Sequence, residues 1–334
     1  MKRLVVIEGD GIGAEVVPQA VRAVKSVAPD VELVSAEMGL NCKKRRGTYL
    51  PDATMDAIHD SDACLFGAIT SPDDDPSYRS PILRLRCELD LYANVRPAKR
   101  IAPDIGMVDL DLILVRENSE GMYTGLEREQ NGAIVLERKV SERACRRICR
   151  RALDLCESER IDRITCVHKA NVLRKSDGMF RRIFYEEAAG RKVGANDMLV
   201  DAAAAALINK PRDFGCIVTL NLYGDILSDE AAALVGGLGM APSGNIGEGY
   251  AVFEPCHGSA PDIAGRGIAN PVAAILSASM SLKYLGMPEA SSLIEDGVKD
   301  VLVSGVRTMD IGGHHSTIGF GDELASIIEA KMKR

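Results

Sequence analysis

Tryptophan is absent from this chain of 334 residues, and aromatic residues make up only 4% of it. Proteins that bind single-stranded nucleic acid stack the bases on aromatic side chains, so this scarcity argues against such a surface. The net charge of −7 points the same way, because no stripe of lysine and arginine dominates the sequence. We therefore expect a small-molecule partner and no nucleic acid.

Long apolar runs are absent as well. A helix that spans a membrane needs about 20 predominantly apolar residues, and no run in this sequence approaches that length. The first apolar run, Leu4 to Ile7, is too short for the apolar core of a signal peptide. These absences predict a cytoplasmic protein with no membrane partner.

The nine cysteines are odd in number and form no C-x-x-C pair. A chain of this length without a secretory signal is not expected to depend on a disulfide framework. Cys145, Cys149 and Cys156 recur at helical spacing among alanine and leucine. This pattern favours small, buried apolar side chains over metal ligands.

Short apolar runs alternate with amphipathic helical patterns along the chain. The strand candidates are Leu4 to Ile7, Val31 to Ala36, Ala63 to Gly67, Leu110 to Val115, Ile164 to Val167, Met198 to Val200 and Cys216 to Leu220. Ser141 is placed to cap one of the helices between them. The alternation predicts an α/β fold with a largely parallel sheet, and the glycine-rich segment from Leu234 to Gly249 predicts a hinge between domains.

Three glycines, Gly9, Gly11 and Gly13, follow the first strand candidate. In the dinucleotide-binding fingerprint the third glycine comes three residues after the second, where this chain has Ala14. Asp10, inside the loop, would also bring a carboxylate toward a pyrophosphate. We therefore predict a tight strand-to-helix turn near a cofactor rather than the standard fingerprint.

Three carboxylates follow strand candidates. Asp225 and Asp229 are four residues apart, so on a helix they share one face and reach one point. Asp201 opens another helical segment directly after a strand. Carboxylates at strand ends suit a hard divalent ion, Mg²⁺ or Mn²⁺, with positions left for substrate. The spacing leaves open the alternative that they only stabilise helix N-termini.

Candidate groups for binding an anion and for moving protons lie between these strands. Arg86, Arg96 and Arg116 each lie in a segment that contains an apolar run. Guanidinium groups bind carboxylates bidentately, so these arginines could bind an anion. Each of them taken alone also fits a solvated surface position. Tyr123 and Lys169, if they lie near a divalent ion and the arginines, should have a lowered pKa and exchange protons near neutrality.

Together these segments resemble the β-decarboxylating dehydrogenases, which include isocitrate, 3-isopropylmalate, homoisocitrate and tartrate dehydrogenases. The resemblance covers nearly the whole chain, and its longest segment is FEPCHGSAPDIAGRGIANP from Phe253 to Pro271. The other segments are Ile7 to Gly13, Leu91 to Pro97, Val115 to Asn118, His168 to Val172 and Asn221 to Asp229. Two small departures from the family's pattern are Ser119 for threonine and Cys256 for valine.

The resemblance implies a fold of two α/β domains that share a sheet, with the active site in a central cleft, and not a standard Rossmann fold. The first, nucleotide-binding domain would combine residues 1–91 and 236–334. The second, which would carry substrate and dimer contacts, would be residues 92–235. The resemblance also implies a homodimer at least, in which Lys169 and Asp201 serve the neighbouring subunit's site.

The resemblance further implies residue roles by matching position. Arg86, Arg96 and Arg116 resemble the family's clamp on the two malate carboxylates. Lys169 resembles the base that takes the hydroxyl proton, and Tyr123 resembles the acid that protonates the enol after CO₂ leaves. The residues that resemble the metal ligands, for Mg²⁺ or Mn²⁺, are Asp201, Asp225 and Asp229.

The family's nucleotide-binding loop is matched by His257, Gly258, Ala260, Asp262 and Asn270. Asp262 implies the choice of cofactor, because a carboxylate accepts hydrogen bonds from ribose hydroxyls and repels a 2′-phosphate. Members of the family that prefer NADP have a Lys-Tyr pair there, which this chain lacks. The resemblance therefore predicts NAD.

The residues before Arg86 should face the variable group of the substrate. Ile82 with Leu83 would form an apolar wall for an isopropyl group, whereas Ser80 would donate a hydrogen bond to a distal carboxylate, as would Arg79 or Arg84. The segment from Ser77 to Ile82 resembles archaeal homoisocitrate dehydrogenases most closely. We expect homoisocitrate as substrate, with 3-isopropylmalate as the alternative and isocitrate third.

A hypothesis from a different class is a non-redox protein that binds a phosphate or nucleotide through the glycine loop. This hypothesis assigns no role to Tyr123 or Lys169.

Overall fold

The computed structural model describes residues 1–72, 75 and 78–333. The chain divides into two compact units. Unit 1 comprises Met1–Leu89, Ile101–Gly106 and Gly236–Arg334, and unit 2 comprises Asp90–Arg100 and Met107–Val235. Helices and strands mix in both units, which confirms the predicted α/β class. The predicted domain bounds, residues 1–91 with 236–334 for the first domain and residues 92–235 for the second, stay a prediction.

Five strands of unit 1 run in the order β2-β1-β3-β12-β11. Their bounds are β1 Arg3–Gly9, β2 Glu32–Ala36, β3 Ala63–Ala68, β11 Pro242–Ile246 and β12 Ala251–Pro255. β1 pairs in parallel with β2 and β3, and β12 pairs in parallel with β3. β11 pairs with β12 antiparallel, so this part of the sheet is mainly parallel.

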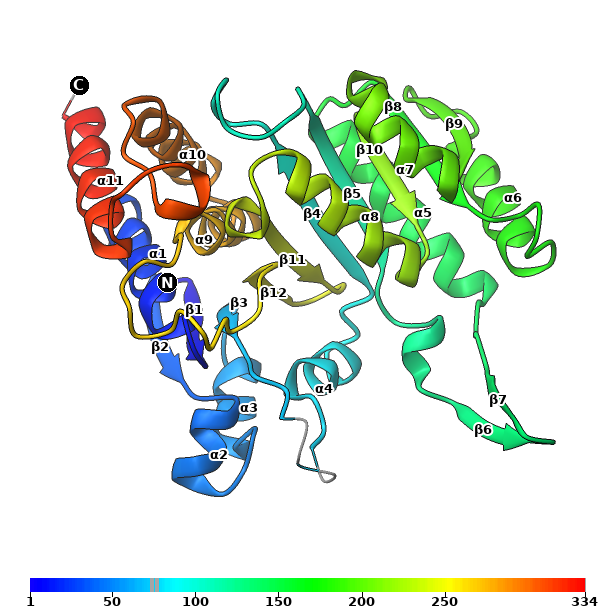
Figure 1. Ribbon diagram of the computed structural model, residues 1–334, viewed down its shortest axis with the longest axis horizontal. Helices are drawn as coiled ribbons and strands as arrows, with labels where there is room; N and C mark the ends of the chain where they lie inside the picture. The colour runs from blue at the N-terminus through cyan, green and yellow to red at the C-terminus, as the bar shows by residue number, and fades with distance from the viewer. Residues whose placement is uncertain (73–74, 76–77, 334) are drawn as a thin grey trace. The chain divides into compact units, whose positions relative to one another are not determined.

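The helices of unit 1 come from both ends of the chain. Their bounds are α1 Gly13–Val27, α2 Leu40–Arg46, α3 Asp52–His59, α4 Pro81–Glu88, α9 Val272–Tyr284, α10 Pro288–Val303 and α11 Thr317–Met332, with short 3₁₀ turns at η3 Leu238–Met240 and η4 Met309–Ile311. Figure 1 shows α1, near the N-terminus, beside α11, near the C-terminus. One apolar core joins Leu4 and Val16 from the start of the chain to Ile275 and Leu324 from its end.

Five strands of unit 2 run in the order β4-β5-β10-β8-β9. Their bounds are β4 Ala93–Lys99, β5 Asp111–Glu117, β8 Arg163–His168, β9 Gly194–Leu199 and β10 Cys216–Thr219. All adjacent pairs are parallel except β4 with β5. A separate antiparallel pair, β6 Glu127–Gln130 and β7 Ala133–Leu136, follows the 3₁₀ turn η1, Met122–Thr124.

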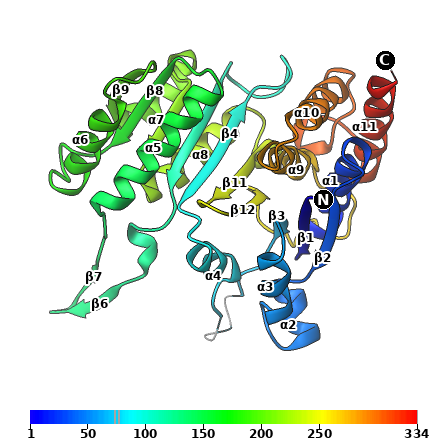
Figure 2. The same ribbon diagram turned by 180° about the vertical axis from the view of Figure 1, so that it is seen from behind.

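Helices cover both faces of the sheet in unit 2. Their bounds are α5 Glu142–Ser158, α6 Ser176–Ala188, α7 Val200–Asn209 and α8 Asn221–Leu234, with a 3₁₀ turn at η2 Pro211–Asp213. Successive strand side chains point to opposite faces, so Cys216 and Val218 pack in one core with Ile148 and Phe180, whereas Ile217 packs in the other. Figure 1 shows α7 and α8 in front of the strands, and Figure 2 shows α5 there from behind.

The glycine loop forms the predicted tight turn between β1 and α1. Gly9 and Gly11 have φ values of +78° and +56°, and a Cβ on Gly11 would lie 1.9 Å from the carbonyl oxygen of Ser259. Asp10 points inward, where its carboxylate accepts hydrogen bonds from the backbone N–H groups of Leu40 at 2.7 Å and Thr70 at 2.9 Å. Its charge therefore holds neighbouring loops and caps α2.

The cysteines and the cap of α5 agree with the sequence predictions. Ser141 precedes α5, and its Oγ accepts a hydrogen bond from the N–H of Ala144 at 3.2 Å. Cys145, Cys149 and Cys156 are fully buried along the same helix. Burial raises the pKa of the Cys145 thiol to about 12, so it stays protonated.

The segment from Leu234 to Gly249, predicted as a hinge between domains, contains the boundary between the two units at Val235 and Gly236. It also contains the buried strand β11, which the sequence patterns do not predict. The sequence patterns also do not predict β4, although Ala93, Asn94 and Val95 are buried in it. In the described part of the chain, no helix is long and apolar enough to cross a bilayer.

Candidate active site

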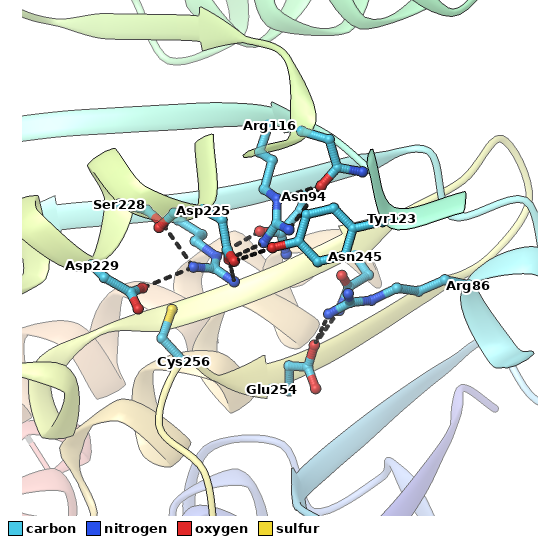
Figure 3. A network of polar contacts seen from close by, with 12 residues as sticks. Arg86, Asn94, Arg116, Tyr123, Asp225, Ser228, Asp229, Asn245, Glu254 and Cys256 are labelled. Atoms are coloured by element: carbon cyan, nitrogen blue, oxygen red, sulfur yellow. Dashed lines mark hydrogen bonds and ion pairs between the residues drawn. The ribbon is translucent and has the colours of Figure 1, made fainter. Parts of the chain in front are cut away.

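A pair of carboxylates on α8 converges on one guanidinium. Asp225 and Asp229 lie one turn apart on α8 (Figure 3). Both pair with Arg96, a residue of β4. The Arg96 Nη2 atom lies 3.5 Å from Asp225 Oδ1, and Nη1 lies 3.1 Å from Asp229 Oδ1. The predicted i, i+4 pair therefore does reach one point, and the guanidinium of Arg96 lies at that point.

Neighbouring side chains hold Arg96 in this position. The Nε atom donates to Asn94 Oδ1 at 2.6 Å, from the same face of β4, and Nη1 donates to Ser228 Oγ at 2.7 Å. Burial raises the pKa of Asp229, and Arg96 offsets part of that effect. The guanidinium is thus fixed by two neutral acceptors as well as by the two carboxylates.

A second arginine, Arg116 at the end of β5, joins the same cluster. Its Nε and Nη2 both donate to Asn221 Oδ1, at 3.1 and 2.8 Å, while Nη1 pairs with Asp225. Its guanidinium also lies over the ring of Tyr123, 5.1 Å from the ring centroid. Arg96, Arg116, Asp225 and Tyr123 therefore form one connected group within unit 2.

The hydroxyl of Tyr123 donates a hydrogen bond to Asp225 Oδ2. Burial raises the pKa of Tyr123, the bond to Asp225 raises it further, and the positive charge of Arg116 lowers it only in part. The positive charge of Arg116 alone therefore does not lower the pKa of Tyr123, and the lowering expected beside a divalent ion stays a prediction. A protonated phenol is the form that acts as an acid.

Lys169 and Asp201 form a second polar group in unit 2. Lys169 directly follows β8, and its ammonium pairs with Asp201 in the first turn of α7. This pairing lowers the pKa of Asp201. His168 has a structural role: it is buried, its Nε2 lies 2.9 Å from Asp197 Oδ2, and its Nδ1 accepts from the N–H of Ala170 at 3.0 Å.

The oxygens of Asp225 and Asp229 suit a hard divalent ion. They already converge on one positive group, and their side chains are 35% and 54% exposed, so solvent and ligand reach them. Asp201 does not join them: among the described residues of one chain, no three histidine, cysteine or acidic side chains gather closely enough to hold a metal. The predicted set of three metal ligands therefore stays a prediction.

The third predicted arginine, Arg86, lies in unit 1. Its Nη2 donates to Glu254 Oε1 at 3.0 Å, and the same oxygen accepts from Asn245 Nδ2 at 2.7 Å (Figure 3). The Nε atom of Arg86 is buried and has no hydrogen-bond partner among the described residues. A buried donor without a partner is costly, so this side chain suits an anionic ligand.

The predicted specificity residues lie at the start of the helix that carries Arg86. Ser80 precedes α4, Ile82 is half-buried, and Leu83 is exposed. In an α-helix Ile82 lies one turn from Arg86 and shares its face. Ser77, the first residue of the segment that resembles homoisocitrate dehydrogenases, lies outside the described residues.

The predicted cofactor residues form a loop of unit 1. The Nδ1 of His257 bonds to the carbonyl oxygen of Gly258 at 2.9 Å, whereas Nε2 is buried without a partner among the described residues. Ala260 has a φ of +39°, and Asp262 is exposed. The unpaired nitrogen lone pair of His257 and the exposed carboxylate of Asp262, five residues further along the loop, both suit a ligand that brings hydrogen-bond donors, as a nucleotide does.

The last predicted cofactor residue, Asn270, makes internal contacts. Its Nδ2 donates to Asp310 Oδ2 at 2.9 Å, and its Oδ1 accepts from the N–H of Val272 at 3.0 Å, which caps α9. A nucleotide that used this amide would replace or share these bonds.

The sequence reasoning missed the residues that hold the arginines: Asn94, Asn221, Ser228, Asn245 and Glu254. Asn94, Asn221 and Asn245 are buried, although asparagine is usually exposed. Asn94 and Asn221 each stand in a mainly apolar stretch, and a buried amide needs a partner. An amide within an apolar run is the sequence signal that could have found these two, whereas no such signal marks Asn245.

The isocitrate/isopropylmalate dehydrogenase family matches residues 3–324 of the chain. The homoisocitrate dehydrogenase of Methanocaldococcus jannaschii is 44% identical, over 100% of this chain and 99% of that protein. The 3-isopropylmalate dehydrogenase of Methanothermobacter thermautotrophicus is also 44% identical, over 98% of each. The crystal structure of isocitrate dehydrogenase from Methylococcus capsulatus superposes with a TM-score of 0.93 at 38% identity, over 98% of this chain and 99% of that one.

Proposed function

Since this chain belongs to the isocitrate/isopropylmalate dehydrogenase family and is a β-decarboxylating dehydrogenase, we propose that it oxidises homoisocitrate with NAD and a divalent metal ion. The observation that carries the proposal is the group of Arg96, Arg116, Tyr123, Asp225 and Asp229. It brings two guanidiniums, a phenol and two carboxylates together within unit 2. Such a set binds a carboxylate substrate, orients it and donates a proton.

The arginines bind the carboxylates of the substrate and keep its reacting carbon oriented throughout the reaction. Arg96 and Arg116 are almost fully buried, so their contacts with substrate are shielded from water and are stronger for it. The third arginine of the proposed clamp is Arg86, which is assigned by its match to the family's motif. The remaining task of the protein is to move two protons.

Lys169, in its neutral form, takes the proton from the hydroxyl oxygen as C2 is oxidised. Tyr123 later donates its phenolic proton to the carbon that lost CO₂. The raised pKa of Tyr123 keeps that proton in place until it is needed. Solvent access to the half-exposed Tyr123 then restores it for the next cycle.

Asp225 and Asp229 would hold the metal ion, with Asp201 of a neighbouring subunit, and His257 with Asp262 would hold NAD. When bound, the ion supplies Lewis acidity at the oxygen on C2, and NAD accepts the hydride. The separation of Asp201 from the pair on α8, among the described residues, supports a homodimer in which each subunit completes the other's site. In such a dimer, the partner subunit's Lys169 would lie at the substrate.

Homoisocitrate is favoured over its two alternatives by the segment before Arg86. Ser80, Arg79 and Arg84 offer donors to a distal carboxylate, and Leu83 is exposed at the same helix. The relatives are divided between homoisocitrate and 3-isopropylmalate, at equal identity. An apolar wall of Ile82 and Leu83 remains the specific feature that favours 3-isopropylmalate.

The direct test is NADH formation, followed by absorbance, with purified protein, NAD and Mg²⁺. Homoisocitrate, 3-isopropylmalate and isocitrate are compared side by side by kcat/KM, and NADP serves as the cofactor control. We expect the highest value with homoisocitrate and NAD, and loss of NADH formation in Lys169→Ala. A preference for 3-isopropylmalate would overturn the proposed substrate, and no NADH with any of the three would overturn the proposed chemistry.

A further inference from the structure

Asp177, the second residue of α6, is fully buried and carries a negative charge away from the cluster on α8. Its Oδ1 accepts a hydrogen bond from Arg138 Nη1 at 2.6 Å. Its Oδ2 accepts from the backbone N–H of Lys169 at 2.8 Å and from the hydroxyl of Tyr223 at 3.1 Å. This one carboxylate therefore joins α6, α8, the segment after β7 and the residue after β8.

Both backbone polar groups of Lys169 have hydrogen-bond partners. The Lys169 carbonyl oxygen accepts from the N–H groups of Val172 at 3.0 Å and Leu173 at 2.9 Å, while Asp177 takes the N–H. The N–H of the next residue, Ala170, donates to Nδ1 of His168, the last residue of β8. These hydrogen bonds fix the backbone conformation of the chain where it leaves β8.

We propose that Asp177 is a positioning residue for Lys169, which fixes the backbone from which the lysine side chain reaches the reacting oxygen. The proposal rests on the proposed function, in which Lys169 takes the hydroxyl proton. A lysine side chain is long and flexible, so the direction of its Cα–Cβ bond and the pairing of its ammonium decide where Nζ lies. Asp201 pairs with the ammonium of Lys169, and Asp177 fixes the direction of its Cα–Cβ bond through the backbone N–H.

The buried pair of Arg138 and Asp177 also explains why a simple truncation is uninformative. Removing one partner of a buried ion pair leaves the other charged and uncompensated, which destabilises the fold strongly. The guanidinium of Arg138 is only 13% exposed, and it also lies over the ring of Tyr223. A test must therefore separate loss of position from loss of stability.

Two variants make that separation. In Asp177→Asn a single oxygen remains, so one of two donors faces an NH₂ group. Either the N–H of Lys169 loses its acceptor, or Arg138 Nη1 keeps only Ser176 Oγ, at 3.3 Å. In the double variant Arg138→Gln/Asp177→Asn, the glutamine oxygen accepts from the new amide, and the asparagine oxygen is left for the N–H of Lys169. The double variant thus restores the acceptor without any buried charge.

Glu187→Gln is the matched control. Glu187 lies on the same helix, and its carboxylate bonds to Arg146 Nη1 at 2.5 Å and to Arg150 Nε at 2.6 Å. Replacing it removes a comparable arginine contact from α6 without touching the residues around Lys169. Its kcat should equal that of the wild type.

The experiment measures kcat, KM, Tm and hydrogen exchange of the peptide that covers residues 169–173, in the full-length protein. We expect Asp177→Asn to exchange faster at Lys169 and to lose about 10- to 100-fold in kcat, the cost of a displacement near 1 Å, with little change in KM. The double variant should recover slow exchange and most of kcat.

Three results would overturn the inference. Equal losses of kcat and Tm in Asp177→Asn and Glu187→Gln would mean that stability alone is affected. Faster exchange with normal kcat, while Lys169→Ala is inactive, would remove the positioning role and leave the proposed function standing. Full activity of Lys169→Ala would instead show that the proposed function assigns Lys169 wrongly, whatever the exchange data report for Asp177.

Discussion

At the scale of single residues, His257 shows how a site can hold an unmet hydrogen-bonding need. Its Nδ1 is committed to the carbonyl oxygen of Gly258, so Nε2 carries a lone pair that is buried without a partner among the described residues. Burial lowers the pKa of His257 from its ordinary value of 6.5, and the bond to Gly258 offsets part of that shift. The folded protein therefore holds this imidazole neutral.

This lowered pKa has a consequence for acid stability. Below the ordinary value, the unfolded chain binds a proton at His257 that the folded protein does not bind, so stability is lost as the pH falls. We expect the decline of Tm between about pH 7 and pH 5 to be shallower in His257→Asn than in the wild type. His59→Asn, which replaces an exposed histidine, is the control and should keep the wild-type slope. An unchanged slope in His257→Asn would contradict the argument.

Residue types at the site were predictable, whereas their pairing was not. The sequence predicts Arg96 as a ligand of substrate and Asp225 with Asp229 as ligands of a metal. The structure shows Arg96 in contact with both carboxylates and held by Asn94 and Ser228. Asn94 and Ser228 are distant in sequence, and both bond to Arg96 because β4 and α8 pack together. No spacing rule along the chain contains that information.

At the scale of secondary-structure elements, α5 is the helix whose start was clearest from sequence. Ser141 Oγ accepts from the N–H of Ala144 and donates to Glu120 Oε1 at 2.8 Å. The serine thus links the first turn of α5 to the segment that precedes Tyr123. The cap contributes to stability through both bonds.

Removing this cap should therefore be measurable. We expect Ser141→Ala to lower the free energy of unfolding by about 1–2 kcal/mol in urea titrations of the full-length protein. Ser158→Ala, at the other end of the same helix, is the control, since the exposed Ser158 hydroxyl only donates to the carbonyl oxygen of Leu155. Its cost should stay within about 0.5 kcal/mol. Equal effects of the two substitutions would argue against capping by Ser141.

Strands were predictable where burial makes them continuously apolar, as in Ala63–Ala68 and Cys216–Thr219. β4 and β11 break that rule for physical reasons. β4 contains Pro97 and turns Asn94 and Arg96 toward the site, and β11 consists of Pro, Ser, Gly, Asn and Ile. Their polar side chains are satisfied by partners from elsewhere in the chain, such as Glu254 for Asn245. A sequence pattern shows that these residues are polar, but it does not show which residues bond to them in the folded chain.

At the scale of the whole molecule, the proposed dimer makes a prediction that mixed subunits can test. Lys169→Ala and Asp225→Asn should each be inactive alone. A dimer with one subunit of each kind contains one site with both residues intact, provided that each site takes Lys169 from the partner. Refolded or co-expressed mixtures should regain about a quarter of wild-type activity.

The alternative arrangement gives a different result. If Lys169 and Asp225 of the same subunit formed one site, no site in the mixed dimer would be intact, and the mixture would stay inactive. A mixture of either variant with itself, treated identically, is the control for the refolding step.

Unit 1 is assembled from both ends of the chain, and its core joins Leu4 and Val16 to Ile275 and Leu324. On the ribosome, which releases the N-terminus first, the opening segment must wait for the last helices before it can bury its apolar faces. Unit 2 is finished once Val235 has emerged. The nascent chain therefore carries a folded middle beside an unfinished start, and chaperones have the longest opportunity to bind that start.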